Sequence, residues 1–191
     1  VLSWFLGFWG EKLWFEALGY ERRFWTEFLA RAGLATGGLV VGGGLLLWLR
    51  AVAEPSQRVI FSVVSGLGAL FGFAWGLAGW ESFLLFLNRV EGGLVEPIIG
   101  LDVSFYLFVL PWIDRLVSLL TTVVVLGLVG AVIGVIQVDG SWPATFNEWL
   151  DKLTSNRAGF RPLVWVAGMA LLAFGIRTFT GAYHLLYSDL G

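Results

Sequence analysis

The sequence predicts an all-α fold: a polytopic bundle of membrane-spanning helices, with amphipathic helices at the membrane surface. Hydrophobic residues make up 58% of the chain, whereas about 45 to 50% is usual in soluble proteins, and the mean hydropathy is +0.81. Several long apolar runs can each cross a bilayer, which takes about 20 apolar residues in a helix because hydrocarbon offers no water to backbone amides and carbonyls. These observations place residues 1–191 in a single transmembrane domain.

We expect four full spans and one incomplete span. The segment VLSWFLGFW at the start is apolar but much shorter than a span, which is typical of the end of a helix whose beginning is missing. Pro55 lies in a very short connection between the next two apolar runs, so those helices must be antiparallel neighbours. The expected spans are residues 1–9 (incomplete), 30–50, 58–79, 112–137 and 162–182.

Aromatic and charged residues are interleaved in three further segments. In the first of them the aromatic residues recur at steps of three and four, so a helix has one aromatic face and one charged face. Such a helix lies along the membrane surface, because Trp and Tyr favour the headgroup level; a loop packed on the bundle is the alternative. The expected interfacial helices are residues 10–28, 80–90 and 143–153, with anchors at Trp14, Trp25, Trp80, Trp142 and Trp149.

Glycines recur at intervals of four residues within the apolar runs. This spacing aligns small residues along one stripe of a helix and lets a second helix approach closely. Dense helix packing is our interpretation, and a transport path lined by glycines is the alternative. The residues expected at helix contacts are Gly38, Gly42, Gly68, Gly72, Gly76, Gly130 and Gly134.

The stretch before the fourth span carries a polar motif, Asp102, Ser104 and Tyr106. These three residues could form a polar site. However, an Asp or Ser just before a helix also accepts hydrogen bonds from the free amides of its first turn. Capping therefore explains the motif at lower cost than a binding site does.

Two further residues are candidates for function. Arg177 lies late in the last span, where a charge is costly, but it is close enough to the boundary for its guanidinium to reach the headgroups. His184 is the sole histidine, and one axial histidine can hold the magnesium of a chlorophyll or the iron of a haem. We expect no cofactor, because interfacial Tyr-His pairs such as Tyr183 and His184 occur without one.

Other chemistry is excluded or disfavoured by composition. The chain has no cysteine, which excludes disulfides, thiolate metal sites and cysteine nucleophiles. A formal net charge of −2 does not favour a nucleic-acid partner. The sequence contains no phosphate-cradling loop, zinc-protease helix or Ser-His-Asp arrangement. We therefore expect a protein that is not an enzyme and has no metal site.

Several blocks of the chain resemble one family. The string GLDVSFYLFVLP at residues 100–111 is similar to the signature of the uncharacterised membrane protein family 0182, and KLWFEALGYERRFW, WESFLLFLN and YHLLYSDLG match further blocks of that family in the same order. Glu96 stands where the family usually has Asp. The resemblance implies a membrane fold, in members that are several times longer and carry a large domain outside the cytoplasm. It implies no established activity.

Charge gives an expected orientation. Lys and Arg are denser in residues 51–58 and 137–161 than on the opposite side, which favours the cytoplasm for these connections. We expect a multi-pass protein of a bacterial inner membrane or a photosynthetic membrane, in contact with lipid and with other membrane subunits. Three functions are consistent with this: a noncatalytic anchoring or assembly domain, which we favour, an accessory subunit of a photosynthetic or respiratory complex in contact with pigment or lipid, and a segment of a transporter or channel.

Overall fold

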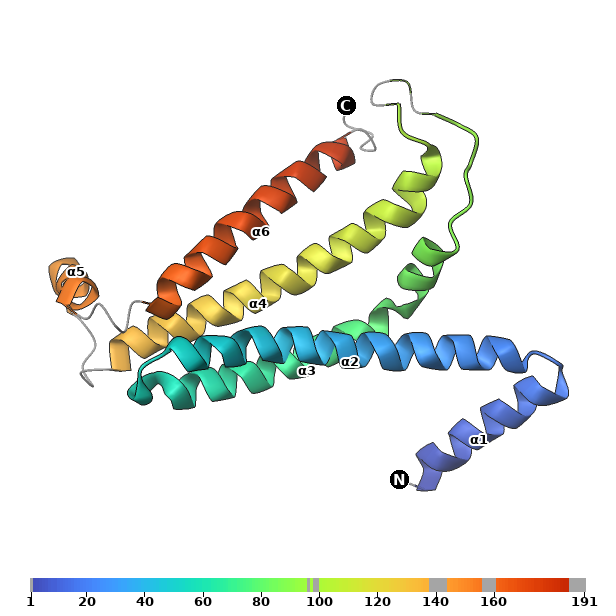
Figure 1. Ribbon diagram of the computed structural model, residues 1–191, viewed down its shortest axis with the longest axis horizontal. Coiled ribbons are helices and arrows are strands. Elements are labelled where there is room, and N and C mark those ends of the chain that lie inside the picture. Colours follow the sequence, from blue (N-terminus) through green and yellow to red (C-terminus); the bar gives the residue numbers. More distant parts are fainter. Residues whose placement is uncertain (1, 96, 98–99, 138–143, 156–160, 186–191) are drawn as a thin grey trace.

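The computed structural model describes residues 2–95, 97, 100–137, 144–155 and 161–185. Within these residues all regular structure is helical, so the predicted all-α helical bundle is confirmed. The elements follow one another along the chain as shown in Figure 1: α1 (Leu2–Ala17), α2 (Glu21–Val52), the 3-10 turn η1 (Pro55–Gln57), α3 (Arg58–Leu87), the π-helical segment η2 (Phe105–Val109), α4 (Leu110–Gln137), α5 (Phe146–Ser155) and α6 (Arg161–Leu185).

Four segments of the described chain are long and apolar enough to cross a membrane, which confirms the predicted number of full spans. Each is close to one helix of the fold or to a helix with the short helical segment next to it. The α1 helix, with 16 residues, is not among them. The candidate spans are Glu21–Val52, Pro55–Leu87, Phe105–Val135 and Arg161–Tyr183.

The α2 and α3 helices form an antiparallel hairpin (Figure 1). The α2 helix ends where Ala53 takes an extended conformation, and Pro55 then starts η1, where its fixed φ and missing amide are tolerated. The connection between the two helices is short, because α3 begins at Arg58. The two helices therefore lie side by side over most of their length.

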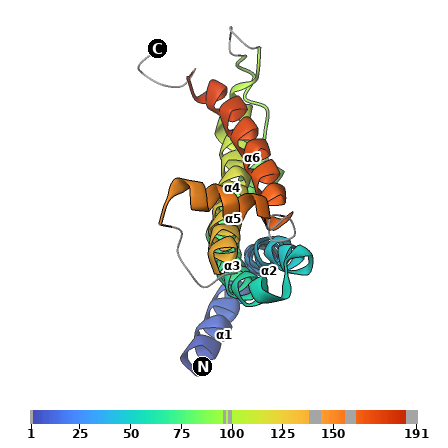
Figure 2. The same cartoon turned by 90° about the vertical axis from the view of Figure 1, so that its left-hand side faces the viewer.

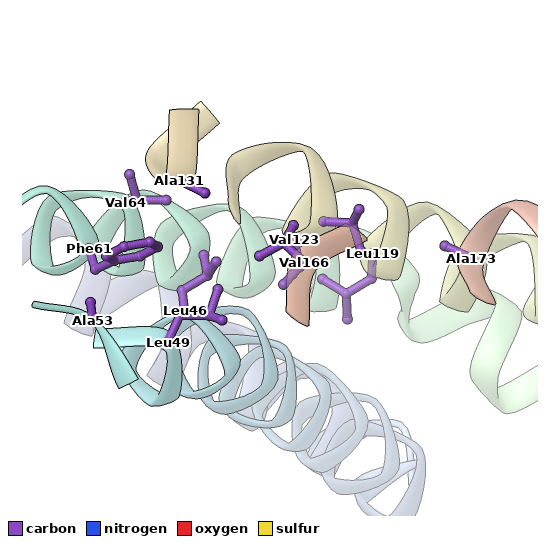
Figure 3. Packing of buried hydrophobic residues seen from close by; sticks show 11 residues of the cluster. Leu46, Leu49, Ala53, Phe61, Val64, Leu119, Val123, Ala131, Val166 and Ala173 are labelled. Carbon is purple, nitrogen blue, oxygen red and sulfur yellow. The ribbon is translucent and has the colours of Figure 1, made fainter. Parts of the chain in front are cut away.

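The α4 and α6 helices form a second antiparallel pair that crosses the hairpin near the α2–α3 turn and diverges from it toward the other end (Figures 1 and 2). Buried apolar side chains gather where the four helices meet (Figure 3). Phe61, Leu46 and Val166 at this place are completely buried. The buried cluster comprises Leu46, Leu49, Ala53, Phe61, Val64, Leu119, Val123, Val124, Ala131, Val166 and Ala173.

Several predicted helix boundaries are corrected by the structure. The expected incomplete span 1–9 and the start of the expected interfacial helix 10–28 form one helix, α1. The helix is interrupted at Gly19, whose φ of 75° favours glycine. The α2 helix then begins at Glu21 and shows no break between the expected interfacial helix and the expected span. The expected separate helix 80–90 is likewise the end of α3. A change from apolar to charged side chains does not end a helix, because the backbone hydrogen bonds continue where no Pro or left-handed Gly interrupts them.

The hairpin is longer than a bilayer is thick. The α2 helix contains 32 residues and α3 contains 30, which correspond to about 48 and 45 Å at about 1.5 Å per residue, against about 30 Å of hydrocarbon. Both helices share one end at the turn. The hairpin is therefore either strongly tilted or extends beyond the hydrocarbon at the end where α2 begins and α3 ends.

Candidate functional site

The α2 and α3 helices meet in a glycine seam formed by Gly38, Gly42, Gly68, Gly72 and Gly76. A Cβ added at Gly38 would collide with the carbonyl oxygen of Gly72, and one added at Gly72 would collide with the carbonyl oxygen of Gly38. Gly42 and Gly68 are related in the same way, and a Cβ at Gly76 would meet the carbonyl of Leu34. The two backbones touch here with no side chain between them.

A buried hydroxyl adds a polar contact to the glycine seam. The Ser65 Oγ donates a hydrogen bond of 2.9 Å to the carbonyl oxygen of Gly43 on the facing helix. Ser65 is only 4% exposed, so no water competes for this carbonyl. Neither Ser65 nor Gly43 was predicted from the sequence; a serine one turn before the glycine pattern of α3 was the available signal.

The glycines of α4 face larger side chains than those of the seam do. A Cβ at Gly130 would lie 3.2 Å from Val64, and one at Gly134 would lie 3.2 Å from the side chain of Gln57. Gly127, which the sequence analysis missed, contacts Val166 and Leu46 in the same manner. The absence of a side chain at these α4 glycines leaves space for side chains from α2, α3, η1 and α6.

An aromatic and arginine contact joins α3 to α4, and sequence reasoning did not identify it. The indole Nε1 of Trp75 donates to the carbonyl oxygen of Arg115 at 2.9 Å, and the Arg115 Nε donates to the Ser82 Oγ at 3.1 Å. Gly79 leaves room for the Arg115 side chain. Trp112, which is buried, packs its ring against Trp75, Phe83 and Phe86. The Trp75 indole and the Arg115 Nε thus both donate to acceptors on the facing helix.

The carboxylate of Asp102 holds together the loop between α3 and α4 through hydrogen bonds. This carboxylate accepts backbone hydrogen bonds from Gly92 and Gly93 at 3.0 Å and from Ser104 at 2.7 Å. The hydroxyl of Ser104 and these backbone amides stabilise the charged form and lower the pKa of Asp102 from 3.8 to about 2. The amide of Val103 donates to the carbonyl of Leu94 beside it. Asp102 therefore caps the helical turn that follows and ties the loop to it.

The other members of the expected polar motif lie near Asp102 but differ in their roles. Ser104 is nearly buried and hydrogen-bonds the Asp102 carboxylate. Tyr106 is buried in η2, with its ring in edge contact with Phe105. The structure thus brings Asp102 and Ser104 together as a helix start, while Tyr106 belongs to the helix packing.

Arg177 is exposed on α6, where the structure shows no carboxylate beside it in the described part of the chain. His184 belongs to the last turn of α6, but its side chain lies outside the described residues. Across the described ranges, no group of three or more His, Asp or Glu side chains could hold a metal ion.

The expected tryptophan anchors occupy different places. Trp14 is exposed on α1, and Trp25 is partly exposed on α2 and donates to Glu21 at 3.3 Å. Trp80 on α3 lies under the guanidinium of Arg31, at 4.5 Å from the ring centre. Trp142 and the side chain of Trp149 lie outside the described residues.

Among the cavities of the described structure, three border α2. One of about 470 Å³ lies where α2 begins and α3 ends, and includes Arg22, Arg23 and Trp80 in its wall. A second, of about 570 Å³, lies between α1, α2 and α3. The third, of about 290 Å³, is lined by apolar side chains of α2, α3 and α4, with Trp75 and Trp112 among them.

The arrangement of these helices defines the class of the protein: a multi-pass helical membrane protein. Comparison with known proteins adds the family. The model of the uncharacterised protein family UPF0182 matches residues 44–191. The chain therefore belongs to UPF0182, which confirms the resemblance inferred from its sequence blocks.

Curated relatives agree with the family model. The chain is 32% identical to a UPF0182 protein of Thermobifida fusca (strain YX) over 151 residues, which cover 66% of this chain and 15% of that protein. It is 30% identical to a UPF0182 protein of Kineococcus radiotolerans over 199 residues, which cover 89% of this chain and 19% of that protein. In Tropheryma whipplei (strain TW08/27), UPF0182 protein TW644 is 29% identical in an alignment over 210 residues, which covers 95% of this chain and 21% of that protein.

The chain thus spans between 15% and 21% of the length of these relatives. All three organisms are bacteria, which agrees with the bacterial part of the expected localisation. No solved structure matches the chain.

Proposed function

We propose that this chain is a noncatalytic membrane domain that anchors and assembles other protein parts at a bacterial inner membrane. The observation that carries the proposal is the glycine seam, which commits the facing surfaces of α2 and α3 to each other through backbone contact at Gly38 and Gly72. Helices joined in this way make a rigid scaffold, because neither can slide or rotate without a collision.

The use of the polar groups supports an anchoring role. Ser65, Trp75 and Arg115 direct their donors to acceptors on neighbouring helices. A transport path through the bundle requires polar groups that face a cavity between the helices, whereas the cavity between α2, α3 and α4 has an almost entirely apolar lining. The described polar groups between the helices therefore favour structure over conduction.

Cysteine labelling tests the membrane arrangement. The chain has no cysteine, so Ser56→Cys in the α2–α3 turn and Glu91→Cys in the loop after α3 each introduce a single reporter. Both positions are exposed. We expect a membrane-impermeant maleimide to label Glu91→Cys in intact cells and Ser56→Cys in inverted membrane vesicles. Labelling of both positions from one side contradicts the proposed topology.

Two measurements separate anchoring from transport. A soluble reporter protein fused to the chain should stay with the membrane after alkaline carbonate extraction, as an integral anchor requires. Vesicles reconstituted with the chain should release potassium ions and a small anionic dye no faster than protein-free vesicles do. Flux above that of the empty vesicles would favour the transporter alternative and contradict the proposal.

A further inference from the structure

Two of the cavities adjoin each other along the hairpin. The cavity of about 470 Å³ contacts Trp80 and Leu84 of α3, and the cavity of about 570 Å³ contacts Leu77 and Phe73 of the same helix, one and two turns further toward the bundle. Glu27 of α2 lines both cavities. Together they make one elongated depression that starts at the beginning of α2 and continues toward its middle.

The outer cavity carries a net positive charge. Arg22 and Arg23 line it, and both are exposed. In the described part of the chain no carboxylate forms an ion pair with either of them. The one acidic residue in the wall, Glu27, is already paired with Arg31 at 2.6 Å. Two guanidinium groups are therefore left to bind an anion.

The chemistry of these groups selects phosphate. A guanidinium presents a planar set of N–H donors that matches phosphate oxygens and binds them in pairs. The phenol of Tyr20 lines the same cavity and adds a hydroxyl donor. The guanidinium of Arg31 stacks on the Trp80 ring in a cation–π contact, at 4.5 Å from the ring centre. Trp80 gives the cavity an aromatic wall of the kind that lies at headgroup level.

The inner cavity is predominantly apolar. Glu11 and the Glu27–Arg31 pair lie at its polar edge. The remaining wall is mainly aromatic and aliphatic, and it is contributed by three helices. Its principal apolar residues are Phe8 and Phe15 of α1, Phe28 and Ala32 of α2, and Phe73 and Leu77 of α3.

We propose that this elongated depression binds one phospholipid with a net negative headgroup. The phosphate lies between Arg22 and Arg23, and an acyl chain follows α2 into the inner cavity. The order of the two cavities fits this occupant, since the charged one lies at the start of the α2 span and the apolar one lies nearer its middle. A soluble phosphate would use the first cavity alone. This inference goes beyond the proposed anchoring role, because it assigns a specific lipid class to one end of the hairpin.

Lipid binding to the full chain in detergent tests the proposal. The probes are dioleoyl phosphatidylglycerol and dioleoyl phosphatidylcholine, which share their acyl chains and differ in net charge, and binding is measured by native mass spectrometry. We expect tighter binding of phosphatidylglycerol. The Arg22→Gln/Arg23→Gln variant should bind it about tenfold more weakly, and Arg22→Lys/Arg23→Lys should retain part of the preference because the charge remains.

Arg50→Gln/Arg58→Gln is the matched control. It removes two exposed arginines at the other end of the hairpin, one from α2 and one from α3, and it should leave the lipid preference unchanged. If this control lowers binding as much as Arg22→Gln/Arg23→Gln does, the attraction is general and the proposed site is wrong. Equal binding of the two lipids by the unmodified chain overturns the proposal without any variant.

A second pair of variants tests the acyl chain. Ala32→Trp should fill the inner cavity and weaken the binding of both lipids, whereas Val40→Trp, at an exposed position of α2, should not. Glycerol 3-phosphate carries the phosphate without a tail. If it displaces phosphatidylglycerol at equal concentration, the site binds free phosphate and the lipid assignment is wrong. Failure of the lipid tests leaves the topology and flux tests of the anchoring proposal unaffected.

Discussion

Gly38 and Gly72 hold α2 and α3 at backbone contact, because the carbonyl oxygen of each lies where the side chain of the other would begin. Neither residue needs an unusual φ for this role. Glycine is required by the space between the helices, and it lowers the helix propensity of both. The contact therefore makes a clear prediction about one added methyl group.

Gly72→Ala should destabilise the hairpin by about 1 to 3 kcal/mol, the usual cost of overpacking a tight contact. The two helices must move apart, since the colliding atom belongs to the backbone of Gly38. Thermal unfolding in detergent, followed by circular dichroism, measures the change. Gly66→Ala is the matched control on the same helix, because a Cβ there meets open space. Equal melting temperatures for the two variants would show that the seam does not limit the packing.

Ser65→Ala should lower the stability by about 0.6 kcal/mol, the average for a hydrogen bond between membrane helices. The Ser65 hydroxyl donates to the Gly43 carbonyl across the seam, and the variant removes this interhelical bond. Ser62→Ala provides the comparison, because the Ser62 hydroxyl donates to Arg58 within its own helix. Unfolding in detergent should distinguish the two variants, with Ser62→Ala close to the unmodified chain. A loss as large in Ser62→Ala would contradict the importance of the interhelical bond.

Trp75→Phe should destabilise the contact between α3 and α4 by about 1 kcal/mol, since an aromatic side chain is kept and the indole donor to the Arg115 carbonyl is lost. Trp165→Phe is a suitable reference. Trp165 is half exposed on α6 and contacts Trp48 through its ring. Melting in detergent should therefore shift for Trp75→Phe and change little for Trp165→Phe.

Asp102→Asn should open the loop between α3 and α4 to proteases. The amide loses the negative charge that attracts the backbone N–H groups of Gly92, Gly93 and Ser104. Limited proteolysis at neutral pH should cut this loop faster than in the unmodified chain. Glu91→Gln removes an exposed carboxylate from the same loop and should leave the cleavage rate unchanged.

The same carboxylate gives the loop a pH dependence. Folding lowers the pKa of Asp102 from 3.8 to about 2, so its stabilising effect is complete above 3.8 and is lost as the pH falls through about 2. Cleavage of the loop by pepsin should therefore be faster at pH 1.5 than at pH 4, once corrected for the enzyme's own pH profile with Asp102→Asn. A variant that shows the same pH dependence as the unmodified chain would contradict this assignment.

The sequence was sufficient for the number of helices that are long and apolar enough to span a membrane, because transfer to hydrocarbon depends on composition and length. It also located the glycines of the seam, since an interval of four places them on one helix face. It failed at the ends of α2 and α3. Aromatic and charged residues after Gly79 or before Arg31 indicate the headgroup region rather than hydrocarbon. A helix can pass from one region into the other without ending, so these residues do not mark a helix boundary.

The contacts of Trp75, Ser82 and Arg115 were missed for another reason. Arg115 lies far from Trp75 and Ser82 in the sequence and meets them only because α4 packs against α3. Arg22 and Arg23 of the outer cavity were not predicted for the same reason. They are ordinary surface charges on a helical wheel, and the cavity exists only where the end of α3 lies beside them.

The turn between α1 and α2 depends on a single backbone torsion, the φ of 75° at Gly19. The chain reverses there, so that α1 folds back at an angle to α2 (Figure 1) and Phe8 and Phe15 form one side of the inner cavity. Gly19 itself borders the outer cavity. A residue that disfavours this angle would straighten the chain and move Phe8 and Phe15 away from α2. The backbone torsion at Gly19 therefore determines whether α1 contributes to the inner cavity.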